Sequence, residues 1–268
     1  MKKFFKVTGN IFAYLFIYLG LQFRVAFISA IPVTLIYLGD TRRLTEALQN
    51  LTFIVTTIAA VIAFLFYVLI FKDKEENLFQ RCRFNKLKLR SSLYVLISAI
   101  GLSSLTCSFV ALYGDKFKSY VDVSETIITG RNSFMTMLCL VVFVPIFEEI
   151  LFRGLVFNEL RKNTNLVLSV ILQAILFGVF HMNILQGIYT SVLAIALALI
   201  YIWTNSIWAP ILLHMFYNLL GTSVIPKLLY KTSDYIYWYV GIGLLLTISF
   251  IFGVYLTEKN NPGESLTV

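Results

Sequence analysis

The chain has 268 residues, of which 59% are hydrophobic and 13% charged, with a formal net charge of +8. A soluble domain is nearer half apolar and a quarter charged, so this composition excludes a soluble protein and predicts an all-α polytopic membrane protein. The basic residues lie in blocks that are expected to set topology and to contact membrane lipids; no folded basic domain for nucleic acid is present.

Eight apolar runs predict eight transmembrane helices that form one bundle, a single membrane domain over 1–268. The runs lie at about 11–39, 51–71, 92–113, 134–157, 166–180, 184–204, 207–224 and 236–256. Most can cross a hydrocarbon layer of about 30 Å at about 1.5 Å per residue. The run at 166–180 is short and is expected to tilt or to end at mid-depth. The last residues, 257–268, are predicted to be a disordered tail.

Lysine and arginine blocks predict the orientation. They occur before the first run, at Lys2, Lys3 and Lys6, and throughout the 72–91 loop. Such blocks favour the cytoplasmic side, whereas the 114–133 loop has balanced charges and suits the outer side. With eight spans in the cell membrane, both termini are predicted to be cytoplasmic. Cys82, in the basic loop, is expected to be reachable from the cytoplasm.

Two adjacent carboxylates, Glu148 and Glu149, lie inside the fourth apolar run. Charge at the centre of a lipid-spanning helix costs about 2.5–3.5 kcal/mol per residue on insertion scales, so a partner or a use is expected. Glu149 shares a helix face with Arg153, four residues on, which predicts a structural ion pair. Glu148 points about 100° away, with Phe152 at its own four-residue position, and remains free to act as a general base.

The chain has two histidines, His181 and His214, and both lie in apolar sequence. His214 is four residues before Asn218, and the two share a helix face. Counted from the inner loops, His214 is expected to lie about 10 Å deep, Glu148 about 15 Å and His181 about 22 Å. These depths predict that the three side chains converge near the middle of the membrane. Taken singly, each histidine suits a packing role; together with the carboxylate and the amide they predict a functional site. Pro145 is expected to kink the helix one turn before the glutamates.

Three ordered motifs carry a family resemblance. They read Glu148-Glu149-x-x-x-Arg153, Phe177-x-x-x-His181 and His214-x-x-x-Asn218, and they lie on successive apolar segments. This pattern resembles the CAAX protease and bacteriocin-processing family over about 134–224, which would be the catalytic core. The resemblance implies an eight-helix, glutamate-dependent intramembrane endopeptidase.

The resemblance also implies roles. Glu148 would activate a water with help from His181, His214 and Asn218 would donate to the oxyanion, and Glu149, Arg153 and Phe177 would support the site. No cofactor is implied, although zinc held by Glu148, His181 and His214 is an alternative. The sequence lacks a His-Glu-x-x-His zinc motif, paired intramembrane aspartates and a Gly-x-Ser-x-Gly elbow.

Two classes of function therefore stay open. One is a protease that cuts a small membrane-associated peptide or protein, such as a bacteriocin or signalling-peptide precursor or a CAAX-type tail. The other is a non-enzymatic bacteriocin immunity or scaffolding protein that binds a peptide or a membrane-protein partner. Substrate identity and oligomeric state are not encoded in these motifs.

Overall fold

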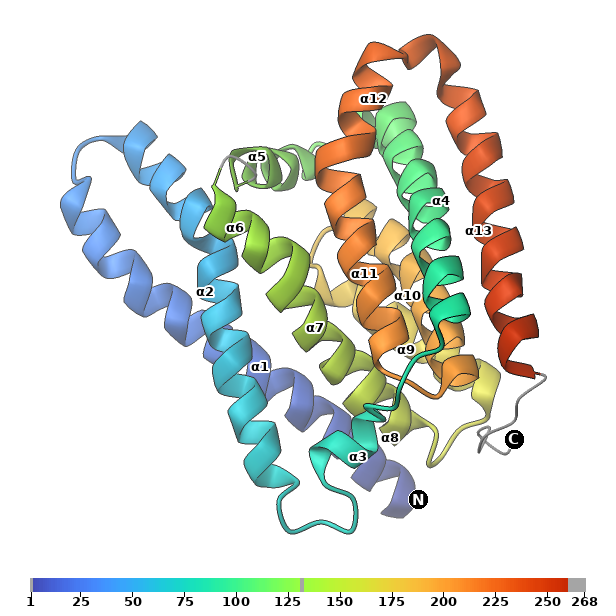
Figure 1. Cartoon of the computed structure of the whole chain (residues 1–268). Helices are drawn as coiled ribbons and strands as arrows, with labels where there is room; N and C mark the ends of the chain where they lie inside the picture. Colours follow the sequence, from blue (N-terminus) through green and yellow to red (C-terminus); the bar gives the residue numbers. More distant parts are fainter. Residues whose placement is uncertain (1, 131–132, 260–268) are drawn as a thin grey trace.

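The computed structural model describes residues 2–130 and 133–259, and every regular element in these ranges is a helix (Figure 1). The long continuous helices are α1 (Lys2–Ile36), α2 (Thr41–Ile70), α4 (Leu89–Tyr113), α10 (Ile184–Thr204) and α13 (Ile236–Lys259). Shorter elements are α3 (Leu78–Cys82), η1 (Gly114–Lys116), α5 (Tyr120–Gly130), α9 (Leu166–Phe180) and η5 (Ser233–Tyr235).

Two further spans are interrupted by π-helical segments. The first runs through α6 (Phe134–Leu138), η2 (Cys139–Phe143), α7 (Val144–Glu149), η3 (Ile150–Phe157) and α8 (Asn158–Leu160). The second runs through α11 (Trp208–Leu219), η4 (Leu220–Val224) and α12 (Ile225–Lys231). These two spans carry the glutamate pair and the His214 motif.

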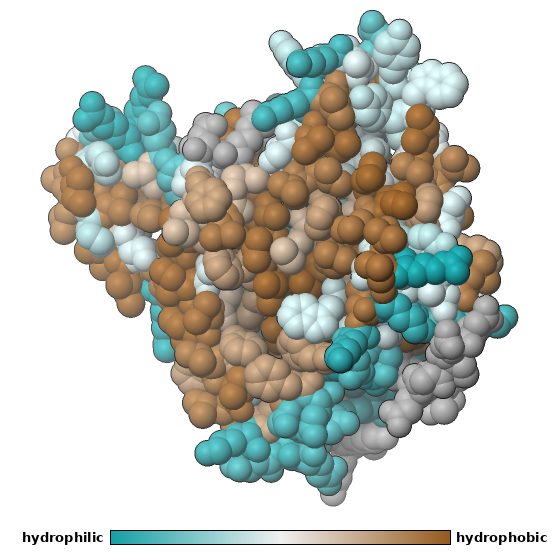
Figure 2. Space-filling model, in the orientation of Figure 1, coloured by the Kyte–Doolittle hydropathy of each residue, from teal (hydrophilic) through white to brown (hydrophobic). Residues whose placement is uncertain are grey.

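The predicted all-α membrane architecture is confirmed. Seven helical spans among the described residues are long and apolar enough to cross a membrane, and α9, with 15 residues, is a shorter apolar helix. Apolar side chains form a broad band around the visible face, with hydrophilic residues above and below it (Figure 2). Phe23 and Phe27 of α1, each 70% exposed, belong to this outward-facing apolar surface. The chain is a multi-pass membrane protein.

The predicted tail is wrong at its beginning, because Thr257–Lys259 belong to helix α13. Glu258 accepts hydrogen bonds from Lys88 Nζ at 2.6 Å and Ser91 Oγ at 2.5 Å, so the last turn is held against the start of α4. Residues 260–268 lie outside the described part of the chain, as do residues 131 and 132 of the predicted outer loop.

The start of α1, helices α3 and α8, and the end of α13 lie at one end of the molecule (Figure 1). A buried ion pair between Arg81 Nη2 and Glu159 Oε2, 2.5 Å apart, links α3 to α8. Asn10 of α1 donates to Glu159 Oε1 at 2.8 Å. These contacts join the segments that the charge pattern assigns to a common side.

Cys82 is fully buried, and the expectation that it is reachable in a loop is wrong. It closes the short helix α3, which packs against η3, and its Sγ lies so close to Gly154 that a side-chain carbon there would overlap it. Burial raises the pKa of the Cys82 thiol to about 12, against a smaller lowering by Arg81. A thiol that is both inaccessible and protonated reacts poorly with alkylating reagents.

Helices α9 and α10 form a closely packed antiparallel hairpin. A side-chain carbon added to Gly178 of α9 would come within 2.5 Å of the Gly187 carbonyl oxygen on α10. Ser191 Oγ donates to the same carbonyl at 2.7 Å. Small residues of this kind let helix backbones approach closely in membranes. The contact fixes the end of α9, which carries Phe177 and His181.

Candidate active site

The glutamate pair lies on α7 between two π segments, η2 and η3. In η2 the Val144 N–H bonds to the Cys139 carbonyl, five residues back instead of four. Such wide turns are rare and occur frequently at functional sites. Pro145 is the sequence signal for this irregularity, because the predicted kink and the π segment occur at the same place.

Pro145 also explains the position of Asn218. If the i+5 pattern continued, the Leu140 carbonyl would accept from residue 145, which is proline and has no N–H. Asn218 Nδ2 instead donates to Leu140 O at 3.0 Å, from the neighbouring span. The amide therefore satisfies a buried backbone carbonyl and keeps its second N–H available.

Glu149 and Arg153 form an ion pair in which both side chains are completely buried. Arg153 Nε lies 3.0 Å from Glu149 Oε2, and Arg153 Nη1 donates to Glu149 Oε1 at 3.1 Å. Arg153 Nη2 donates to the Ala194 carbonyl at 3.2 Å, and the guanidinium lies over the Phe177 ring, 4.8 Å from its centroid. A buried charge needs this number of partners, because its hydration is lost.

Glu149 also holds His214, a contact that sequence spacing did not predict. Glu149 Oε1 lies 2.7 Å from His214 Nδ1, so this contact joins the two spans that carry these residues. A carboxylate oxygen accepts and does not donate, so Nδ1 carries the hydrogen. Glu149 therefore fixes both the ring orientation and the tautomer of His214, leaving Nε2 turned toward the other glutamate.

Glu148 is the carboxylate of the pair that faces the cavity. Its side chain is 12% exposed, against 0% for Glu149, and its Oε2 lies 3.7 Å from His214 Nε2. That separation is too long for a direct hydrogen bond but leaves both atoms directed at one small region. The two adjacent glutamates thus have different environments, one enclosed by Arg153 and His214 and one open to the cavity.

His181 lies at the C-terminal cap of α9, where the helix ends because Met182 adopts a left-handed backbone conformation with φ of 56°. His181 Nδ1 lies 2.8 Å from the Phe177 carbonyl oxygen. A carbonyl oxygen only accepts, so Nδ1 donates, and Nε2 is the acceptor in the neutral ring. The Phe177 ring contacts both histidine rings, with centroids 4.9 Å from His181 and 5.9 Å from His214.

Tyr18 of α1 is a neighbour of the site that the sequence did not indicate. It is 1% exposed and packs on Phe147 at 4.6 Å and on Phe180 at 5.6 Å between ring centroids. These phenylalanines immediately precede Glu148 and His181. The first span therefore fixes the positions of two candidate catalytic residues, although its sequence shows only apolar character.

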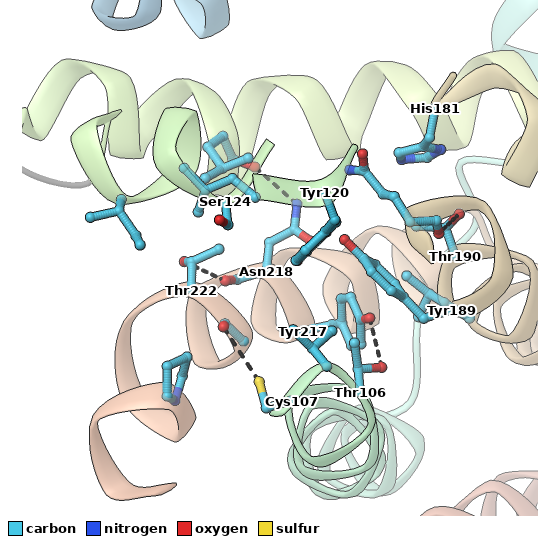
Figure 3. Close-up of a pocket in the computed structure, with 18 of the residues that line it drawn as sticks. Thr106, Cys107, Tyr120, Ser124, His181, Tyr189, Thr190, Tyr217, Asn218 and Thr222 are labelled. Atoms are coloured by element: carbon cyan, nitrogen blue, oxygen red, sulfur yellow. Dashed lines mark hydrogen bonds between the residues drawn. The ribbon is translucent and has the colours of Figure 1, made fainter. Parts of the chain in front are cut away.

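Glu148, His181, His214 and Asn218 all line one cavity of about 680 Å³. Figure 3 shows side chains from several helices directed into this space, with Tyr120 and Tyr189 close together and Asn218 beside Thr222. Tyr120 and Ser124 come from α5, which covers the cavity between α2 and α10. The volume is in the range of small-molecule and peptide side-chain pockets.

The zinc alternative needs three ligands directed at one point. Among the residues that the structure describes, no group of three or more His, Cys, Asp or Glu side chains has that arrangement. His214 directs its Nδ1 to Glu149 and His181 directs its Nδ1 to a backbone carbonyl. Each ring thus has one nitrogen, Nε2, left for water, substrate or an ion.

The fold and this site define a multi-pass membrane protein with a buried carboxylate–histidine–amide centre. Residues 129–220 match the family model described as "Type II CAAX prenyl endopeptidase Rce1-like". The resemblance to the CAAX protease and bacteriocin-processing family is therefore confirmed over this segment, which contains all three motifs.

A curated protein of Bacillus subtilis (strain 168), named "Putative membrane peptidase YdiL", is 31% identical to this chain over 74 residues. The match covers 28% of this chain and 30% of that protein, so the similarity spans less than a third of the relative's length. No solved structure matches the chain.

Proposed function

We propose that this protein is an intramembrane endopeptidase in which Glu148 activates a water molecule for peptide hydrolysis. The observation that carries the proposal is the asymmetry of the glutamate pair. Glu149 is enclosed by Arg153 and His214, whereas Glu148 opens to the cavity and has no ion pair shorter than 3.7 Å. A general base must be within reach of its water and must not be neutralised by a strong partner.

His181 supplies the second contact for the water. Its neutral ring presents Nε2 as an acceptor, because Nδ1 donates to the Phe177 carbonyl. Two acceptors, Glu148 and His181, can orient both hydrogens of one water and aim its lone pair at a peptide carbonyl. Attack then gives a tetrahedral intermediate with no covalent enzyme adduct, while the proton passes to Glu148 and later to the leaving amine.

The oxyanion that develops in this step needs preorganised donors. Asn218 offers its second amide hydrogen, since the first goes to the Leu140 carbonyl. His214 can donate from Nε2 only as an imidazolium, because Nδ1–H already donates to Glu149. Glu149 would thus orient His214 as well as pair with Arg153.

The match of residues 129–220 to the family model supports a small membrane-associated peptide or protein as the substrate. The cavity is lined by residues of the apolar spans α2, α4 and α10 and of the two spans that carry Glu148 and His214, together with residues of α5. The reaction as proposed uses side chains alone and no metal ion.

The oxyanion role of Asn218 gives a quantitative test. Asn218→Ala is expected to lower the rate of peptide cleavage by on the order of 10²–10³, because removal of one oxyanion donor has that effect in other hydrolases. Residual turnover should be measurable, since His214 remains. The measurement is cleavage of a fluorogenic peptide by the purified variant. Asn163→Ala is the control, because Asn163 does not line the cavity. A loss below tenfold in Asn218→Ala would contradict the role.

We also propose that both termini and the basic loop are cytoplasmic. A cysteine introduced at the exposed Lys74 is expected to react with an impermeant maleimide only after the cells are opened, whereas one at the exposed Lys118 should react in intact cells. Native Cys82 should remain unlabelled in both conditions, because it is buried and its pKa is raised to about 12. Labelling of Lys74→Cys in intact cells would reverse the orientation.

A further inference from the structure

We propose that the cavity accepts an uncharged internal stretch of a peptide and discriminates against a free C-terminal carboxylate near the cleaved bond. This inference rests on the proposed endopeptidase function and narrows its substrate class. The substrate would be cut within an apolar segment, with chain continuing past the cavity, and not at the end of a short tail.

The charge of the cavity wall is the main observation. Among the described residues that line it, none is lysine or arginine, and Glu148 is the one carboxylate. A substrate carboxylate would therefore enter a low-dielectric space with no fixed cation and with a like charge nearby. Burying an unpaired charge is strongly unfavourable.

The buried groups behind the wall do not change this balance. Glu148 and Glu149 contribute two negative charges and Arg153 one positive charge, which Glu149 neutralises at 3.0 Å. If His214 were protonated, the net charge of Glu148, Glu149, Arg153 and His214 together would be zero. The His214 ring lies between the two glutamates. Arg153 is itself completely buried and cannot reach the substrate.

Lys227 and Lys231 of α12 are exposed and are not part of the lining. The wall instead carries hydroxyl groups from Thr106, Tyr120, Tyr189 and Tyr217, and Tyr217 Oη donates to Thr106 Oγ1 at 2.9 Å (Figure 3). Hydroxyls both donate and accept, which suits the amides of an extended peptide backbone. Leu140, Val144 and Leu193 provide apolar wall for its side chains.

The test uses one fluorogenic peptide of alanine, valine and leucine in three forms. In the first, the quenched segment ends in a free carboxylate a few residues after the cleaved bond. In the second it ends in an amide at the same position, and in the third the apolar chain continues. The purified protein in lipid nanodiscs is expected to cleave the amide and the extended form with kcat/KM at least about tenfold above the free acid. Equal rates, or a preference for the acid, would overturn the proposal.

A cation placed in the wall should weaken the discrimination. Ser124→Lys, on the cavity face of α5, is expected to raise the acid-to-amide ratio of kcat/KM severalfold. Val121→Lys is the matched control, because Val121 lies on the same helix, is 50% exposed and does not line the cavity. It should leave the ratio unchanged. A ratio that rises equally in both variants would show a general charge effect and contradict the proposal.

Binding separates this inference from the endopeptidase function itself. The three peptides are titrated into the His181→Ala variant, which keeps the Glu148 carboxylate and is expected to be nearly inactive, and binding is followed by fluorescence anisotropy. Tighter binding of the amide without any cleavage by the native protein would support the substrate class and overturn the protease. Cleavage with a preference for the acid would do the opposite, and failure of every peptide to bind would contradict both.

Discussion

Replacement of Glu148 by glutamine is expected to abolish peptide cleavage while the protein still folds and binds substrate. Glutamine keeps the shape of the side chain and most of its hydrogen bonding but cannot accept a proton from water. Glu148 lies 3.7 Å from His214, whereas Glu149 lies 3.0 Å from Arg153 and 2.7 Å from His214, so thermal stability should change less than on loss of Glu149. Cleavage by the purified variant is followed by mass spectrometry, and His181→Ala should be nearly as inactive.

Two outcomes would count against this account of Glu148. Cleavage by Glu148→Gln at a rate near that of the native protein would show that another group activates the water. Full biological function of Glu148→Gln cells, with no cleavage in either protein, would favour the immunity or scaffolding function. Glu125→Gln is the matched control, because Glu125 is exposed on α5 and does not line the cavity.

Arg153→Ala is expected to have the largest effect on folding. The substitution leaves Glu149 buried without its guanidinium partner. It also removes the bond to the Ala194 carbonyl and the contact with the Phe177 ring. Breaking a buried ion pair in this way costs roughly 3–5 kcal/mol. The measurement is the yield of folded protein and its thermal unfolding in detergent.

The chain provides a matched control for Arg153. Arg42 and Glu46 form an ion pair at the same i,i+4 spacing, 3.1 Å apart, but at the surface, with the Arg42 side chain 88% exposed. Exposed pairs contribute about 0–1 kcal/mol, so Arg42→Ala should leave yield and unfolding temperature nearly unchanged. If Arg153→Ala accumulates normally, with unchanged unfolding temperature and no activity, the arginine is catalytic and its structural role is wrong.

The contacts that sequence spacing could predict are those within one helix. Apolar runs were sufficient to place the spans, and the short run 166–180 coincides with α9. The four-residue interval between Glu149 and Arg153 corresponds to an ion pair in the structure, because the intervening turn keeps them on one face even where the helix becomes π-helical.

Contacts between helices were not predictable in the same way. Nothing in the local pattern indicates that His214 meets Glu149, that Asn218 meets the Leu140 carbonyl or that Tyr18 packs beside the site. Each depends on the relative rotation and depth of two spans, which one sequence does not specify. Pro145 gave a partial indication of the Asn218 contact. Proline has no N–H, so a backbone carbonyl of the preceding turn needs another donor.

The prediction that Cys82 is accessible was wrong for a similar reason. Its loop is polar and basic in sequence, yet α3 folds back onto η3 and the thiol packs against Gly154. The Arg81–Glu159 ion pair holds this short helix in place. A charged loop in a membrane protein can thus be ordered by a few buried partners that are distant in the sequence.

Cleavage by the purified native protein, with and without a strong zinc chelator and with elemental analysis of the same sample, tests the central claim most directly. If Glu148 activates water without a metal, the cleavage rate is unchanged by the chelator, the sample holds no stoichiometric metal, and Glu148→Gln is inactive in both conditions. Stoichiometric zinc, with activity lost on chelation and restored by zinc, would contradict the mechanism.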